Sequence, residues 1–226
     1  GGAIGIDLGV KTLATCSDGT VFENQKHYRR GVGRIKGLSK GLSRKVEGSQ
    51  NWWKNTKQLA KAQYRVACQR ADVLHKMTTH VAQTYAVIGL EDLNVRGMLA
   101  NHHLAQAVSD ASFFEVKRQL RYKAEHSGSV IQLVGRWYPS SKTCSACGWR
   151  DAALTLADRA FVCAVCGLSI DRDLNAARNI KAETLRLVTD VPAVASSERE
   201  YACGAGSAGA LCGEGETSCR EAGTKV

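Results

Sequence analysis

Four cysteines in the second half of the chain have the type and spacing that bind a metal ion. They form two C-x-x-C pairs separated by 15 residues, and a glycine follows each pair, at Gly148 and Gly167. Two such pairs can aim four thiolates at one tetrahedral Zn²⁺, and a site with four protein ligands is structural rather than catalytic. We favour zinc over two disulfides or four free thiols, because the paired spacing is specific and nothing in the sequence indicates secretion. The candidate ligands are Cys144, Cys147, Cys163 and Cys166.

A pair of carboxylates follows the cysteines directly. Asp171 and Asp173 stand in the run DRDLNAA, at the start of a helical pattern. Acidic residues suit the N-terminal end of a helix dipole, so the pair could act only as caps. Alternatively, one of the carboxylates holds a catalytic metal ion. The motif alone leaves both interpretations open.

Further acids stand in apolar runs that are typical of buried strands. Asp7 lies in AIGIDLGV, and Glu91 and Asp92 lie in VIGLEDL. A lone acid in such a strand is costly unless it is paired or binds a metal ion. For Asp7, which should point away from the flanking apolar side chains, the alternative is a strand-end acid that backbone groups satisfy.

The elements that must position these acids follow from the hydrophobic pattern. Three short strands begin the chain, and the Asp-Gly pair at 18–19 predicts a tight hairpin between the second and the third. Helices, a strand, a helix, a strand and a last helix follow, which indicates an α/β fold. The expected helices cover 29–47, weakened by four glycines, then 52–85, 104–126 and 173–188. The later strands are expected at 87–93 and 129–137, with a loop at 94–98.

One acid marks the first strand, one the fourth strand and one the start of the last helix. This arrangement follows the logic of the ribonuclease-H-like fold, in which distant acids meet at one end of a mixed sheet and hold two Mg²⁺ ions. Two such ions about 3.5–4 Å apart can activate a water and stabilise the leaving oxygen of a phosphodiester. We therefore interpret the acid after the cysteines as the third ligand that Asp7 and Glu91 require.

The positive charge of the chain is concentrated in one segment. The 226 residues carry a net charge of +10, yet residues 26–76 alone hold fourteen lysines and arginines and only two acids. A local excess of this kind, larger than the net charge of the whole chain, is what a nucleic-acid-binding face needs. The bland alternative is a solvated helix surface.

The remaining composition bears on the compartment. We find no secretory signal and no apolar run long enough to span a bilayer, so we expect no membrane partner. The number of cysteines is nine, which is odd, and four of them are explained by zinc. A reducing, cytoplasmic compartment fits this usage best.

The motifs together resemble one protein family. The stretches GIDLGVKTLATCSDG, IGLEDLNVRGM and CSACGWR…CAVCGLSIDRDLNAARNI look like the three RuvC motifs and the inserted zinc ribbon of the TnpB/OrfB family. These transposon-encoded proteins, long labelled transposases, are related to type V CRISPR effectors and include RNA-guided DNA endonucleases. The similarity covers about residues 3–188, and its four motifs occur in the right order.

The resemblance implies a role for each motif residue. It assigns Asp7, Glu91 and Asp173 as catalytic ligands of two Mg²⁺ ions, for which Mn²⁺ can substitute, and the four cysteines as ligands of a structural Zn²⁺. It prefers Glu91 to Asp92, and it leaves Asp171 as a cap or a neighbour of the metal ligands. The implied partners are DNA and, in full-length relatives, a guide RNA, and the implied process is DNA transposition and recombination.

The expected domain organisation follows from the same motifs. We expect a RuvC-like core at 1–140, a zinc ribbon at 141–170, a third-motif helix at 171–189 and a disordered, low-complexity tail at 190–226. Members of the family carry a large N-terminal part that holds the guide, whereas only six residues precede Asp7 here. The chain therefore looks like a C-terminal half, and the alternative function is a truncated remnant that binds nucleic acid without guided cleavage.

Overall fold

The computed structural model describes residues 1–155 and 157–190, and it begins with the predicted meander of three strands. The hairpin turns at Gly19, whose φ of +94° is a conformation that glycine adopts without strain, and the Asp18 carboxylate accepts a hydrogen bond from the Thr20 N–H. The first strand pairs antiparallel with the second, and the second with the third. The strands are β1 (Ala3–Leu8), β2 (Thr12–Cys16) and β3 (Val21–Glu23).

Two later strands complete a mixed sheet on the other side of β1. They are β4 (Val87–Glu91) and β5 (Val130–Val134), and the sheet order is β3-β2-β1-β4-β5. β4 runs parallel to both β1 and β5. Parallel neighbours end at the same edge of a sheet, so β1 and β4 present their last residues, which include the predicted acids, side by side.

The two faces of the sheet are built differently. Ile4, Ile6 and Ile88 join the main hydrophobic core with residues of the helices on one face. The opposite face carries Gly5 and Gly89, which are directly paired in the β1–β4 ladder. Since successive side chains of a strand alternate between faces, the side chains two residues beyond these glycines also point to the glycine face.

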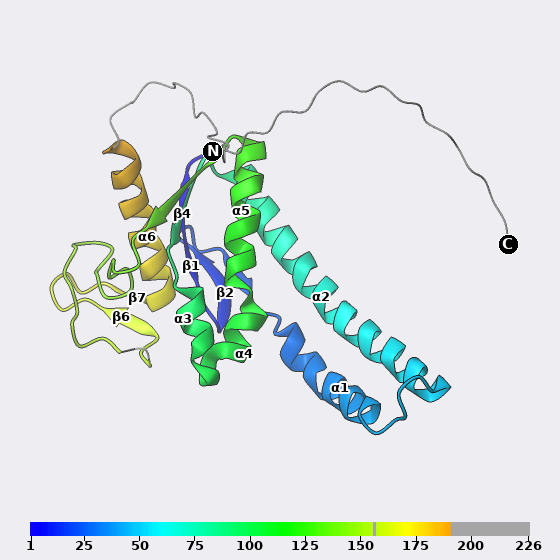
Figure 1. Ribbon diagram of the computed structural model, residues 1–226. Coiled ribbons are helices and arrows are strands. Elements are labelled where there is room, and N and C mark those ends of the chain that lie inside the picture. The colour runs from blue at the N-terminus through cyan, green and yellow to red at the C-terminus, as the bar shows by residue number, and fades with distance from the viewer. Residues whose placement is uncertain (156, 191–226) are drawn as a thin grey trace, which may run out of the picture. The chain divides into compact units, whose positions relative to one another are not determined.

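The last helix packs on the glycine face at very short range. A Cβ added at Gly5 would lie 2.2 Å from the Ala177 carbonyl oxygen, and one added at Gly89 would lie 2.0 Å from Thr184 Oγ1. Only glycine allows this approach, which sets the last helix directly against β1 and β4. That helix is α6 (Arg172–Thr189), and Figure 1 shows it on the opposite side of the sheet from α2 and α5.

Two antiparallel helices form the basic segment, as Figure 1 shows for α1 and α2. They are α1 (His27–Leu42) and α2 (Gln50–Thr84), and α2 confirms the long helix predicted from the hydrophobic pattern. The helix α1 forms although four glycines lower its propensity. At position 31 the packing of α1 against α2 favours glycine, because a Cβ there would lie 2.8 Å from Val66 Cγ2 on α2.

Two expectations for the segment after β4 were wrong. The stretch expected as a loop contains a short helix, because the Asn94 side chain accepts a hydrogen bond from the Gly97 N–H and caps it. The single helix expected at 104–126 is two helices, since Ser112 takes a left-handed conformation with φ +57°. The three helices are α3 (Val95–Ala100), α4 (His102–Ala111) and α5 (Phe113–Ser127).

The cysteine-containing segment carries a small two-stranded sheet of its own. Its strands, β6 (Ala160–Val162) and β7 (Ser169–Asp171), pair antiparallel around a local core that includes Phe161. The described residues all belong to one compact unit. The predicted tail at 190–226 lies, apart from Asp190, outside the described residues.

Candidate active site

The structure brings the three predicted acids to the wall of one cavity of about 850 Å³. Asp7 comes from the end of β1, Glu91 from the end of β4 and Asp173 from the first turn of α6. Asp7 and Glu91 stand two residues beyond Gly5 and Gly89, on the face against which α6 packs. The close approach that those glycines permit is therefore what brings Asp173 to the same cavity.

Asp7 is the most perturbed of the three acids. Burial first, and then the negative charges of Glu91 and Asp173, raise its pKa from 3.8 to about 7. Desolvation and like-charge repulsion both disfavour the ionised form of a carboxylate. An acid in this position is stabilised in its ionised form by a cation that can share the cavity with it.

Glu91 is oriented by a buried hydroxyl group. The Ser140 Oγ donates a hydrogen bond to Glu91 Oε1, and Ser140 itself is 5% exposed. Burial raises the pKa of Glu91, and the hydrogen bond from Ser140 opposes that rise. The neighbouring Asp92 takes a different role, since its carboxylate binds Lys117 at 2.8 Å and Arg136 at 2.9 Å.

The two acids after the cysteines are also distinct in the structure. Asp171 is the N-cap of α6, and its Oδ1 accepts hydrogen bonds from the backbone N–H groups of Asp173 and Leu174. Of the two roles left open for Asp171, a cap or a neighbour of the metal ligands, the structure shows the cap. The Asp173 carboxylate instead lies in the cavity, with Arg172 Nη2 3.1 Å from its Oδ1.

The spacing of the three carboxylates is wider than that of a closed metal cluster. Over residues 1–155 and 157–190, one group of histidine, cysteine or acidic side chains has all its ligand atoms within 4.8 Å of one another, and it consists of the four cysteines. The three acids thus share a cavity and an electrostatic field without forming a closed cluster of ligand atoms. An open cavity of this kind leaves room for ions and a substrate oxygen between the carboxylates.

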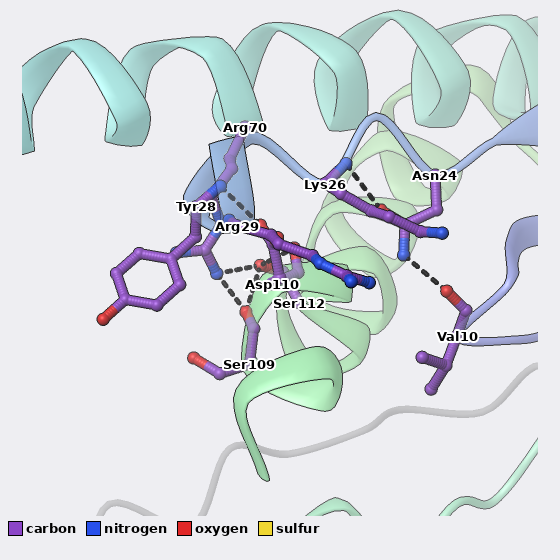
Figure 2. Close-up of polar contacts among 9 residues, drawn as sticks. All are labelled: Val10, Asn24, Lys26, Tyr28, Arg29, Arg70, Ser109, Asp110 and Ser112. Carbon is purple, nitrogen blue, oxygen red and sulfur yellow. Dashed lines mark hydrogen bonds and ion pairs between the residues drawn. The ribbon is translucent and has the colours of Figure 1, made fainter. Parts of the chain in front are cut away.

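The wall of the cavity beside the acids is basic. Lys26 and Arg29 come from the start of α1, and Lys11 comes from the turn after β1. Lys26 has a left-handed backbone with φ +49°, and Asn24 holds this turn by accepting from the Lys26 N–H and donating to the Val10 carbonyl. In Figure 2 the Lys26 side chain extends alongside the Asn24 side chain.

A buried acid fixes the start of α1 from another helix. Asp110 of α4 accepts hydrogen bonds from the backbone N–H groups of Tyr28 and Arg29, and its Oδ1 lies 3.9 Å from Arg70 Nε of α2. Figure 2 shows this carboxylate between the first turn of α1 and Arg70. Since Lys26 provides no side-chain cap, Asp110 replaces it and ties the basic helices to the wall of the cavity.

The four predicted zinc ligands converge on one point. The Sγ atoms of Cys144 and Cys166 lie 3.6 Å apart, and those of Cys147 and Cys163 lie 3.5 Å apart. All four thiols are free, which excludes the disulfide alternative for the structure described here. Ligands about 2.3 Å from a tetrahedral Zn²⁺ stand roughly 3.8 Å from one another, so the four thiols can hold one such ion.

Two asparagines of α6 join the cysteine cluster to the cavity. The Asn175 side chain accepts from the Ser145 N–H and donates to the Thr143 carbonyl, and Asn179 donates to the carbonyls of Ser140 and Thr143. Both asparagines are buried. The first cysteine pair, the hydroxyl that orients Glu91 and the helix that carries Asp173 are thus connected by hydrogen bonds.

Sequence reasoning missed several residues of this site. It did not find Ser140, Asp110, Asn175 or Asn179, and it gave the paired glycines of β1 and β4 no role in delivering α6. The spacing of the two asparagines, four residues apart within a helix that carries Asp173, was the signal that could have revealed a buried polar face.

Comparisons with known proteins agree with the motifs. Residues 1–102 match the OrfB_IS605 family model, described as "Probable transposase", and residues 113–180 match the model of the Cas12f1-like TNB domain. The chain is 40% identical over 183 residues to a "Putative RNA-guided DNA endonuclease" of Streptomyces pristinaespiralis, which covers 81% of this chain and 45% of the relative. The predicted resemblance to the TnpB/OrfB family is confirmed.

A second relative and a solved structure extend the comparison. "Putative RNA-guided DNA endonuclease InsQ" of Escherichia coli K12 is 36% identical over 194 residues, covering 79% of this chain and 48% of the relative. The structure of a CRISPR-Cas12f ternary complex matches with a TM-score of 0.58 at 20% identity, over 79% of this chain and 38% of that one, which indicates a shared fold. The chain spans about half the length of the curated relatives it matches.

One further finding concerns membranes. Within the described ranges, no helix has both the length and the apolar character needed to cross a bilayer.

Proposed function

We propose that this chain carries the nuclease centre of a DNA endonuclease of the TnpB/OrfB type, built on a RuvC-type, ribonuclease-H-like fold. The observation that carries the proposal is the convergence of Asp7, Glu91 and Asp173, from three distant segments, on one cavity at the ends of the parallel strands β1 and β4. The strand order β3-β2-β1-β4-β5 supports the same assignment.

The acids would hold divalent metal ions, with Mg²⁺ as the expected ion and Mn²⁺ as its substitute. The fit rests on the donor set, because carboxylate oxygens suit hard cations and because the burial of Asp7 beside two other acids calls for positive charge. When bound, such ions supply charge stabilisation and an activated water for phosphodiester hydrolysis. Ser140 keeps the Glu91 carboxylate in one orientation toward the cavity.

The basic residues beside the acids would hold the substrate strand. Lys26 and Arg29 line the cavity beside the acids and can bind phosphates next to the cleaved bond. The exposed bases of α2, which include Lys54, Lys57 and Lys61, extend this positive surface. Relatives are named for RNA-guided cleavage of DNA, so a guide RNA is a proposed partner together with DNA, and transposition is the proposed process.

The four cysteines would hold a structural Zn²⁺. Their Sγ separations of 3.5–3.6 Å suit a tetrahedral site, and all four positions of such a site are taken by protein. We propose a zinc ribbon at 141–170 between a nuclease core at 1–140 and the helix at 171–189. Through Asn175 and Asn179, this ribbon holds the start of α6 and therefore positions Asp173.

The test is cleavage of labelled single-stranded DNA by the zinc-loaded chain, with and without Mg²⁺ or Mn²⁺. Each of Asp7→Asn, Glu91→Gln and Asp173→Asn should lower the cleavage rate about 100-fold or more, because metal stabilisation of the transition state is worth several kcal/mol. DNA binding should remain within about twofold of the unaltered chain, since the asparagine and glutamine variants keep the shape of the cavity.

The control is Glu125→Gln, which neutralises an exposed acid of α5 outside the cavity and should cut normally. If the chain binds DNA but shows no metal-dependent cleavage that the three variants abolish, the nuclease assignment is wrong. The alternative would then be a protein that binds nucleic acid through α1 and α2 without cutting it.

A further inference from the structure

A second cavity, of about 390 Å³, adjoins the candidate active site. It is bounded by α3, the start of α5 and the ends of β1 and β4. Leu8 and Glu91 line both cavities, so the two share a wall at the catalytic edge of the sheet. The second cavity therefore lies next to any ligand that the first one binds at Glu91.

The second cavity is strongly basic. Five of its lining residues are cations, whereas Glu91 is the one acid among them. Positive lining of this density selects an anionic ligand, and a cavity of this volume accommodates a unit of about nucleotide size. The five cations are Arg96, Lys117, Arg118, Arg121 and Arg136.

Some of these cations are held in place by acids. The Asp92 carboxylate binds Lys117 Nζ at 2.8 Å with one oxygen and Arg136 Nη2 at 2.9 Å with the other. The hydrogen bond from Lys117 and then that from Arg136 lower the pKa of Asp92. Asp92, next to the proposed metal ligand Glu91, thus holds two cations at the second cavity, Lys117 from α5 and Arg136 from the loop after β5.

Two other cations have no acid of their own. Over the ranges that the structure describes, no carboxylate lies within ion-pair distance of Arg96 or Arg121, whereas Arg118 binds Glu115. Both unpaired arginines are exposed to solvent at the edge of the cavity. A guanidinium in that state is available to bind a phosphate with two parallel hydrogen bonds.

An exposed aromatic ring stands beside them. Phe114 is 68% exposed and lines the cavity, whereas the preceding Phe113 is 2% exposed and fills the core. The Phe114 ring does not contribute to the packing of α5, because Phe113 makes the contact with the core. An exposed ring next to unpaired arginines is the combination on which single-stranded nucleic acids stack and bind.

We propose that the second cavity binds the nucleotide adjacent to the cleaved bond of the single-stranded DNA substrate. Arg96 and Arg121 bind its phosphate, and Phe114 stacks on its base. The proposal rests on the proposed function, because the shared wall at Glu91 makes this strand the ligand. It adds a substrate position that the three acids and the basic wall of the first cavity do not provide.

The experiment measures binding of a fluorescent single-stranded DNA oligonucleotide, in buffer without Mg²⁺, as a function of salt. The double variant Arg96→Ala/Arg121→Ala should raise the Kd about tenfold. It should also lower the slope of log K against log salt by about 0.7, since each phosphate contact to a single strand contributes about 0.7 and both arginines bind the same phosphate. A merely structural role of the arginines would leave that slope unchanged.

The aromatic residue is tested separately. Phe114→Ala should also raise the Kd about tenfold, but it should leave the salt slope unchanged, because stacking releases no counterions. Phe114→Trp should restore the affinity. The matched control is Arg150→Ala/Arg178→Ala, which removes two exposed arginines that line neither cavity and should change the Kd less than twofold.

Two results would overturn the proposal. One is a Kd for the double variant equal to that of the Arg150/Arg178 control. The other is a loss of affinity for a matched RNA oligonucleotide with none for DNA, which would assign the cavity to a guide. This assay measures binding and needs no cleavage. A chain that fails to cut DNA would therefore refute the proposed function, but the binding result would still test the role of the second cavity.

Discussion

At the scale of single residues, the ionised acids of the cavity lower the stability of the folded chain. Asp7 is buried beside Glu91 and Asp173, and each of these conditions raises its pKa. Without a cation, each ionised carboxylate in the cavity lowers the free energy of unfolding. In the proposed function, divalent ions bound between the acids would offset this repulsion.

This conflict predicts the pH dependence of stability without divalent ions. The pKa of Asp7 is about 7 in the folded chain and 3.8 as the reference for the unfolded one, so the folded state alone holds its proton between these values. The free energy of unfolding should therefore fall as pH rises from about 4 to about 7, by on the order of 4 kcal/mol from this group, at ~1.4 kcal/mol per pKa unit.

The matching variant is Asp7→Asn, which cannot ionise. Urea unfolding of the zinc-loaded chain in Mg²⁺-free buffer should show this variant to be more stable than the unaltered chain at pH 8, with the difference shrinking toward pH 4. Equal stabilities of the two chains at pH 8 would mean that ionised Asp7 does not destabilise the folded state.

At the scale of elements, the approach of α6 to the sheet depends on glycine. A Cβ at Gly5 would lie 2.2 Å from the Ala177 carbonyl oxygen and 2.3 Å from the Lys181 nitrogen, both backbone atoms that cannot turn away. Gly5→Ala should therefore destabilise the fold by about 3 kcal/mol or more and shift α6, which carries Asp173. Gly2→Ala, with no atom within 4 Å, is the control in the same urea titration.

The start of α1 depends on Asp110 in a similar way. Asp110→Ala would leave the N–H groups of Tyr28 and Arg29 without their acceptor and Arg70 without its acid, at a cost of about 1–3 kcal/mol. Hydrogen exchange should accelerate in the first turn of α1. Asp72→Ala, which breaks an exposed pair with Lys76, should cost less than about 0.5 kcal/mol, and an equal effect of both variants would refute the capping role.

The sequence predicted most of the elements, including the strands and the helix that carry the three acids, because these depend on local patterns. The meander, α2 and the alternation that turns Asp7 away from the core all follow from hydrophobic periodicity. What was missed depends on contacts between distant segments. The break at Ser112 coincides with hydrogen bonds from Arg70, and the role of Gly5 appears only when α6 lies against it. Such tertiary contacts override local propensity.

At the scale of the whole molecule, the cysteine cluster and the cavity should be coupled through zinc. A structural Zn²⁺ of this kind contributes on the order of 10 kcal/mol to folding, so its removal should unfold the ribbon and release the contacts to Asn175 and Asn179. We expect one zinc per chain by metal analysis, and loss of both zinc and cleavage in Cys144→Ser. Undiminished cutting by the zinc-free variant would show that the ribbon does not position Asp173.

The central claim is that the three acids present metal ions to a DNA phosphate, and sulfur substitution tests it most directly. Single-stranded DNA with a phosphorothioate at the cleaved position should be cut slowly in Mg²⁺, which binds sulfur poorly, and faster in Mn²⁺, which accepts it. Asp7→Asn should abolish cleavage with either ion. Equal rates in Mg²⁺ for the normal and the sulfur-substituted strand, or cleavage that survives Asp7→Asn, would contradict the account.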